Sequence, residues 1–164
     1  MDTVKVSIDI GRPVEAVFAY LLDMANHAEY TDHYLVDWHL TRTDPVGVGA
    51  GARFRVRAPL QRFAWVGLNI VEVEPLRRIV EAGSGGKFNR IKVEAVYTLS
   101  ATDGEKTQIE LRTKTEPATV SDRLMELVAG RPWLRRQNGK ALRRLRSILE
   151  SGEGRGARPT VAGL

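Results

Sequence analysis

Apolar residues near the start of the chain recur first at every second position and then at helical spacing. Residues 4–10 alternate between apolar and polar, which predicts a strand with one buried face. The apolar positions of residues 14–22 follow at helical spacing, and Pro13 stands where a helix can begin without losing a hydrogen bond. Asp23 can end this helix and cap a second short helix over residues 24–30.

From residue 36 to residue 112 the pattern has a period of two and is interrupted by turn sequences. We expect six strands here, joined mostly by short connections, so that neighbouring strands run antiparallel. The glycine-rich stretches at 47–51 and 83–87 superficially suggest phosphate-binding loops. Both lead into a strand, whereas a phosphate loop opens a helix, so we interpret them as turns.

The last periodic segment, residues 120–150, places its apolar side chains within one arc of a helix. Such a helix would be about 45 Å long, and Pro132 should kink or interrupt it. Residues 151–164 are rich in glycine and lack periodicity, which predicts a disordered tail. The domain prediction is therefore one domain over residues 1–150, followed by the tail.

The order of these elements favours an α+β fold. A seven-stranded antiparallel sheet with a single long C-terminal helix must curve around that helix to bury its apolar face. The two short helices after the first strand would then plug one end of the curved sheet.

Four stretches of the chain resemble a known superfamily in their order and spacing. They are "IDIGRPVEAVFAYLLD", residues 44–56, "IVEVEPLRRIV" and "NGKALRRLRSILE". Over about residues 3–150 the chain resembles the START/Bet v 1-like (SRPBCC) superfamily, in particular its bacterial polyketide cyclase/dehydrase and lipid-transport branch. The resemblance implies a helix-grip fold with a hydrophobic cavity for a lipid, sterol, polyketide, quinone or similar molecule. Some relatives are cyclases or aromatases, but they share no catalytic motif, so no catalytic residue is carried over.

Composition and charge narrow the function classes. The chain has no cysteine, which excludes disulfides, thiolate-bound metals and a cysteine nucleophile. The first residues lack the pattern of a secretory signal, and no apolar run approaches the roughly 20 residues of a membrane span, so we expect a cytoplasmic protein. The net charge of +5 is concentrated at Arg53, Arg55 and Arg57 and on the polar face of the last helix. This is either a solvated surface or a contact surface for an anionic membrane or nucleic acid.

The candidate site follows from the expected cavity. Aromatic and apolar side chains on the strands and helix would form its wall, and polar Arg131 and Asn138 project onto the apolar arc of the helix, where a ligand or the backbone would satisfy them. The candidate cavity residues are Trp38, Phe54, Phe63, Trp65, Tyr97, Arg131, Leu134 and Asn138, and the candidate rim residues are His27, Tyr30 and Tyr34.

The three histidines, His27, His33 and His39, are spaced by six residues, which fits neither a helix face nor the ligand spacing of zinc sites. We therefore expect no metal and no cofactor.

Three functions stay open at this point. The leading hypothesis is binding, transport or sequestration of a hydrophobic small molecule, with no nucleic-acid partner and with a monomeric or homodimeric state. The second is a cyclase or dehydratase that acts on an apolar carbonyl substrate. The third is a basic surface that binds an anionic membrane or nucleic acid.

Overall fold

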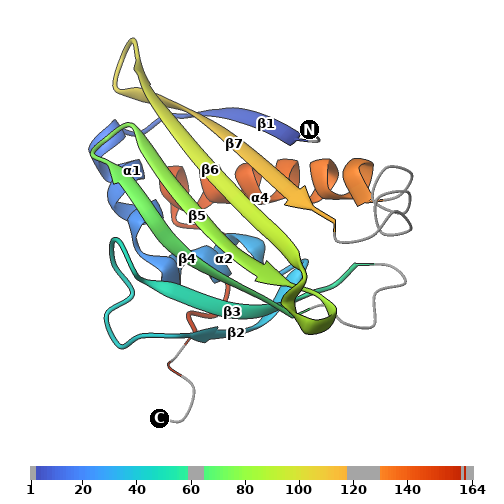
Figure 1. Ribbon diagram of the computed structural model, residues 1–164. Coiled ribbons are helices and arrows are strands. Elements are labelled where there is room, and N and C mark those ends of the chain that lie inside the picture. The colour runs from blue at the N-terminus through green and yellow to red at the C-terminus, as the bar shows by residue number, and fades with distance from the viewer. Residues whose placement is uncertain (1–2, 59–64, 118–129, 160, 162–164) are drawn as a thin grey trace.

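A computed structural model describes residues 3–58, 65–117, 130–159 and 161. Its seven strands form one antiparallel sheet in the order β1-β7-β6-β5-β4-β3-β2 (Figure 1). The elements are β1 (Thr3–Ile10), α1 (Val14–Leu22), α2 (Met24–Thr31), β2 (Leu35–Leu40), β3 (Gly51–Val56), β4 (Trp65–Glu74), β5 (Arg78–Gly85), the short 3₁₀ turn η1 (Lys87–Asn89), β6 (Ile91–Thr102), β7 (Lys106–Glu116) and α4 (Arg131–Ser151). The predicted α+β helix-grip fold is confirmed.

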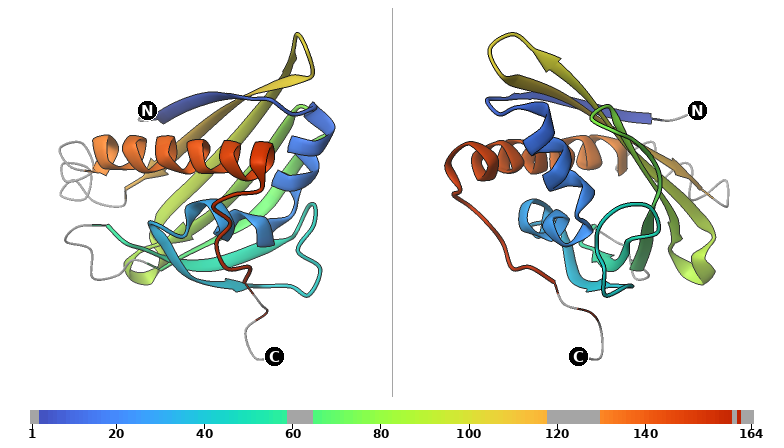
Figure 2. Two further views of the ribbon diagram at one scale, coloured as in Figure 1. Left: turned by 180° about the vertical axis from the view of Figure 1, so that it is seen from behind. Right: turned by 90° about the vertical axis from the view of Figure 1, so that its left-hand side faces the viewer.

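The sheet is strongly curved, and α4 crosses its concave face (Figure 2). Side chains at alternate strand positions point into the space between the sheet and the helix, where they meet the apolar side of α4. Ile79, Ile109, Leu142 and Leu145 are fully buried in this core. The helices α1 and α2 cover one end and one side of the sheet (Figure 2), as the order of elements predicted for the two short helices.

Asp23 forms the junction between α1 and α2. Its Oδ1 accepts a hydrogen bond of 2.9 Å from the backbone N–H of Ala25, which satisfies one of the unpaired donors at the start of α2. The predicted N-cap is confirmed.

The sequence predicts that Pro132 kinks or interrupts the long C-terminal helix. In the described residues α4 begins at Arg131, and Pro132 lies in its first turn, where the missing N–H breaks no helical hydrogen bond. The 21 residues of α4 span about 31 Å. Residues 120–129 of the expected longer helix lie outside the described residues.

The segment after α4 lies along α2 and makes specific contacts. The backbone N–H of Gly156 donates to the carbonyl of Glu29 at 3.1 Å, and Arg158 pairs with Asp23 at 2.6 Å. Val161 forms a bridge with Leu40 of the edge strand β2. These contacts correct the expectation of a disordered tail for residues 152–159.

Candidate ligand-binding site

The inner face of the sheet is buried at one end and only partly buried at the other. Near α1 its side chains are buried, for example Ile70 on β4 and Leu99 on β6. Toward the other end the inner-face residues Val66 and Val93, on the same two strands, are only partly buried. Apolar side chains are therefore only partly covered at this end of the concave face, where β3 ends and α4 begins (Figure 1), and we call it the half-open end.

Two aromatic candidates meet on this inner face. Between Val36 and His39 the register with β3 shifts, so that two residues of β2 oppose one residue of β3. The bulge turns the ring of Trp38 toward Phe54, with the ring centroids 4.5 Å apart. Phe54 is buried and Trp38 is half-buried, so both lie on the inner side of the sheet, and their role in binding a ligand stays a prediction.

A histidine and a carboxyl group form a pair inside the molecule. His27 on α2 and Glu81 on β5 are 2% and 3% exposed, and Nδ1 of His27 lies 3.2 Å from Oε1 of Glu81. This oxygen has no partner with hydrogen-bond geometry among the described residues. An unsatisfied buried carboxyl oxygen costs free energy, so Glu81 is a group that a bound polar atom would stabilise.

The other nitrogen of the ring fixes the tautomer. Nε2 of His27 lies 2.7 Å from the carbonyl oxygen of Leu21, which can only accept, so Nε2 carries a hydrogen. A neutral ring then presents the lone pair of Nδ1 to Glu81, and this contact is repulsive unless one proton resides on one of the two groups. Burial raises the pKa of Glu81, while the nearby His27 opposes this rise.

Two tyrosines complete this part of the interior. The hydroxyl groups of Tyr30 and Tyr97 share a hydrogen bond of 3.0 Å, and both rings pack against His27, with centroids 5.5 and 5.7 Å away. Burial is the main cause that raises the pKa of each phenol well above 10, and Glu81 raises both further. Both therefore stay neutral in the folded protein and can act as hydrogen-bond donors or acceptors. We call His27, Glu81, Tyr30 and Tyr97 the interior polar cluster.

Asn138 connects three parts of the fold. Its Oδ1 accepts a hydrogen bond of 3.0 Å from the hydroxyl of Tyr34, and its Nδ2 donates to Oγ1 of Thr113 at 3.0 Å. The side chain thus ties α4 to β7 and to the segment after α2. Both ends of the amide are occupied by protein groups, so the structure gives Asn138 a bridging position within the interior.

The three expected rim residues are not at a rim. His27, Tyr30 and Tyr34 are 2%, 0% and 7% exposed. The sequence suggested a segment lying over the opening, but α2 packs between α4 and the strands β2 and β3, so these side chains lie in the interior. They are corrected from rim to interior residues.

Trp65 also differs from its expected place. It is opposite Arg55 on β3, and its ring stacks on His39, with Arg53 5.2 Å from the ring centroid. Arg55, His39 and Arg53 are exposed on the outer face, so Trp65 lies on that face and not in the cavity wall.

Two further candidates lie at the half-open end. Arg131 and Leu134 are half-buried in the first turns of α4, beside this end of the sheet. Phe63 lies outside the described residues.

Sequence reasoning missed Glu81, the least expected member of the interior polar cluster. A weak signal was present, because Glu81 follows Ile79 by two residues and therefore shares its face in a regular strand. Since Val80 is buried as well, that strand lacks the clean alternation that would have marked one face as interior.

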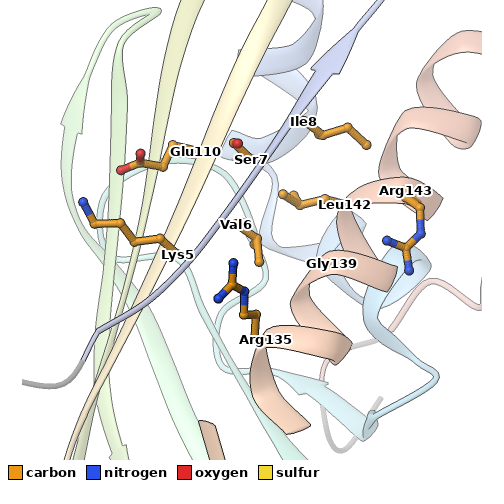
Figure 3. A pocket seen from close by; sticks show the side chains of 9 residues that line it. All are labelled: Lys5, Val6, Ser7, Ile8, Glu110, Arg135, Gly139, Leu142 and Arg143. Carbon is orange, nitrogen blue, oxygen red and sulfur yellow. The ribbon is translucent and has the colours of Figure 1, made fainter. Parts of the chain in front are cut away.

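A separate groove lies between β1 and α4 (Figure 3). It has a volume of about 440 Å³, and its lining includes apolar Val6 and Leu142 together with charged Lys5, Arg135 and Arg143. None of the interior polar cluster lines it, so the groove and the cluster are two distinct features.

Further along the same helix, Arg144 does not belong to the expected free basic face, because it pairs with Asp32.

Comparison with known proteins agrees with this architecture. The model of one protein family, which is described as polyketide cyclase/dehydrase and lipid transport, matches residues 1–150. The chain belongs to this family. The match covers the sheet, both short helices and nearly all of α4, and it supports a fold that binds hydrophobic ligands. No match was found among curated proteins.

Solved structures show the same fold at low sequence identity. The KanY protein (ms6282) is 15% identical, with a TM-score of 0.74, and the alignment covers 92% of this chain and 98% of KanY. TTHA0849 from Thermus thermophilus is also 15% identical, with a TM-score of 0.73 and coverage of 93% and 99%. Norcoclaurine synthase from Thalictrum flavum is 11% identical, with a TM-score of 0.63 and coverage of 91% and 87%. None of the helices in the described residues is both long and apolar enough to span a membrane.

Proposed function

We propose that the protein binds a hydrophobic small molecule that carries at least one polar oxygen or nitrogen, in the interior between the concave face of the sheet and α4. The observation that carries the proposal is the position of Glu81. Its carboxyl oxygen is buried without a hydrogen-bond partner among the described residues, while apolar side chains toward the half-open end are only partly covered.

The two halves of such a ligand would meet different parts of the interior. Its apolar part would cover Val66, Val93 and Leu134, with burial contributing about 25 cal/mol per Å² before the cost of association. Its polar atom would reach Glu81 and the neighbouring Tyr97. The family supports this division, because polyketides and lipids both combine long apolar regions with a few oxygens.

The test is uptake of the apolar fluorescent probe N-phenyl-1-naphthylamine by delipidated protein, followed by its displacement with lipid extracts. Two variants on β4 form a matched pair. Val66→Trp fills space on the inner face, whereas Val71→Trp adds the same bulk at an exposed position of the same strand. We expect saturable uptake by the wild type and by V71W and a loss of at least about tenfold in affinity for V66W, since an indole would occupy the volume of the probe. Equal uptake by all three proteins would contradict an interior site.

A second candidate function is an enzyme that moves a proton next to a carbonyl group. The specific observation that favours it is the contact between His27 and Glu81, two groups that can hold and transfer a proton, within reach of two neutral phenols. In this role His27 would take a proton from the carbon beside the carbonyl, and Tyr97 would donate a hydrogen bond to the developing oxyanion.

This candidate is tested by deuterium exchange at the α-carbon of a long-chain methyl ketone in D₂O, followed by NMR. Catalysed exchange that is lost in both His27→Ala and Glu81→Gln would support the enzyme. Exchange at the buffer rate, with probe binding intact, would reject the enzyme and leave ligand binding as the function.

A further inference from the structure

The turn between β5 and β6 exposes a phenylalanine to solvent. Phe88 is 79% exposed, more than any other large apolar side chain that the described residues expose, and Val48 follows at 61%. The ring leaves most of its apolar surface in water, so it is available to contact something apolar, and the surroundings of the ring decide what that is.

The backbone of the turn has an unfavourable conformation at Phe88. Phe88 has φ 60° and ψ 26°, and Asn89 has φ 53°, which puts two successive residues in the left-handed region. A bulky residue other than glycine adopts this conformation at a cost in free energy, and such positions are found mainly where function requires them.

Positive charge surrounds the ring. Between Ser84 and Val93 the chain has three basic residues and no acidic one. Nζ of Lys87 lies 5.2 Å and Cζ of Arg90 lies 5.8 Å from the centre of the Phe88 ring. Nε of Arg90 also donates to the carbonyl oxygen of Lys87 at 3.2 Å, which ties the two ends of the turn together. The turn thus presents an aromatic tip between two cations.

The turn lies at the half-open end of the sheet. Gly85, which precedes it, is paired with Val66 on one side and with Ile91 on the other. Val66 is one of the partly covered inner-face residues, whereas the β4–β5 turn, which contains Leu76, lies at the opposite end near α1 (Figure 1).

We propose that the β5–β6 turn docks the protein onto an anionic lipid membrane. Phe88 inserts at the level of the headgroups and upper acyl chains, and Lys87 and Arg90 contact lipid phosphates. An aromatic ring flanked by cations matches this interface, where amphipathic and aromatic groups lie between water and hydrocarbon and each basic residue is attracted by the negative surface. The docking does not depend on the proposed interior ligand. If that ligand exists, the half-open end faces the membrane, so an apolar molecule passes between the membrane and the interior of the protein without crossing water.

The absence of cysteine gives a direct test. Phe88→Cys is labelled with the polarity-sensitive fluorophore NBD, and Leu76→Cys is the matched control. Leu76 is also an exposed apolar residue with a positive φ, 61°, in a tight turn of the same sheet, but at its other end. Both labelled proteins are mixed with two kinds of vesicle. One contains phosphatidylcholine alone, and the other contains phosphatidylcholine with about 30% of the anionic lipid phosphatidylglycerol.

We expect a blue shift of the label at position 88 on anionic vesicles only, and no shift at position 76. In unlabelled protein, Phe88→Ala should weaken co-sedimentation with these vesicles about tenfold, and K87E/R90E by at least that factor. The proposal is overturned if the label at 88 stays in water, if both labels shift alike, or if charge reversal leaves binding unchanged. It is also overturned if the shift appears without vesicles as protein concentration rises, since the turn would then contact a second copy of the chain. The uptake of N-phenyl-1-naphthylamine by F88A is measured without vesicles, so that a loss of membrane docking can be told apart from a loss of ligand binding.

Discussion

Replacing Glu81 with Gln should change how the stability of the protein depends on pH. Burial raises the pKa of Glu81, so the folded state holds a proton that the unfolded state loses near pH 4.5. The stabilisation from this proton is complete below pH 4.5 and is lost progressively as pH rises toward the raised pKa. Each pH unit between the two values costs about 1.4 kcal/mol of unfolding free energy. Gln has nearly the same shape but no proton to lose, so the variant should lack this decline.

The assay is urea denaturation at a series of pH values from 5 to 8, with the free energy of unfolding extrapolated to water. At pH 5 the two proteins should differ little, because the wild-type carboxyl is protonated and resembles the amide. At pH 8 the Gln variant should be the more stable. The control is Glu94→Gln, which removes the same charge from an exposed position on the neighbouring strand β6 and should keep the wild-type profile.

Two results would refute the reasoning. Parallel stability curves for the wild type and E81Q would mean that the pKa of Glu81 is not raised in the folded state. A wild-type curve that rises from pH 5 to pH 8 relative to E81Q would reverse the sign and show that the carboxylate stabilises the fold.

Three other predictions follow from single contacts. Asn138→Ala should lower the free energy of unfolding by about 2 kcal/mol in urea denaturation, because Tyr34 and Thr113 lose their partner inside the protein. Asp23→Ala should cost about 1 kcal/mol and speed amide exchange in α2, since the cap and the contact with Arg158 are lost. The four tyrosines all have raised pKa values, with burial as the main cause, so absorbance at 295 nm should show no phenolate at pH 10 in the folded protein. Titration near pH 10 would contradict their burial.

Much of the fold could be predicted because it depends on local patterns. Alternating strands, a proline at a helix start and an aspartate between two helices each act within a few residues. Their order left few ways to bury the apolar faces, so the curved sheet around one helix followed. Pro132 shows the limit of this reasoning, because a proline near an apolar arc can kink a helix, interrupt it or begin one, and the pattern alone does not choose between these.

The site was harder to predict because it depends on contacts between distant segments. His27 was noticed as a polar residue near an opening, but its partner Glu81 is on a strand 54 positions later, and only the packing of α2 against the interior brings the two together. Trp65 lies in a stretch that is apolar on both faces, so the sequence could not decide its side. Its pairing with Arg55 places it on the outer face.

The pH dependence of ligand binding can identify the polar atom that meets Glu81. A ligand carbonyl can only accept a hydrogen bond, so it requires the protonated carboxyl and would raise the pKa of Glu81 further. Its affinity must then fall as pH rises through that pKa. A ligand hydroxyl can accept from the protonated carboxyl and donate to the carboxylate, so it can bind both forms and its affinity need not fall over the same range. In both cases the stabilisation by a saturating ligand follows its affinity, and E81Q should remove the pH dependence. Affinity that falls steeply through this pH range therefore indicates a ligand that only accepts, such as the carbonyl that the enzyme candidate requires, whereas affinity that stays level or rises indicates a hydroxyl.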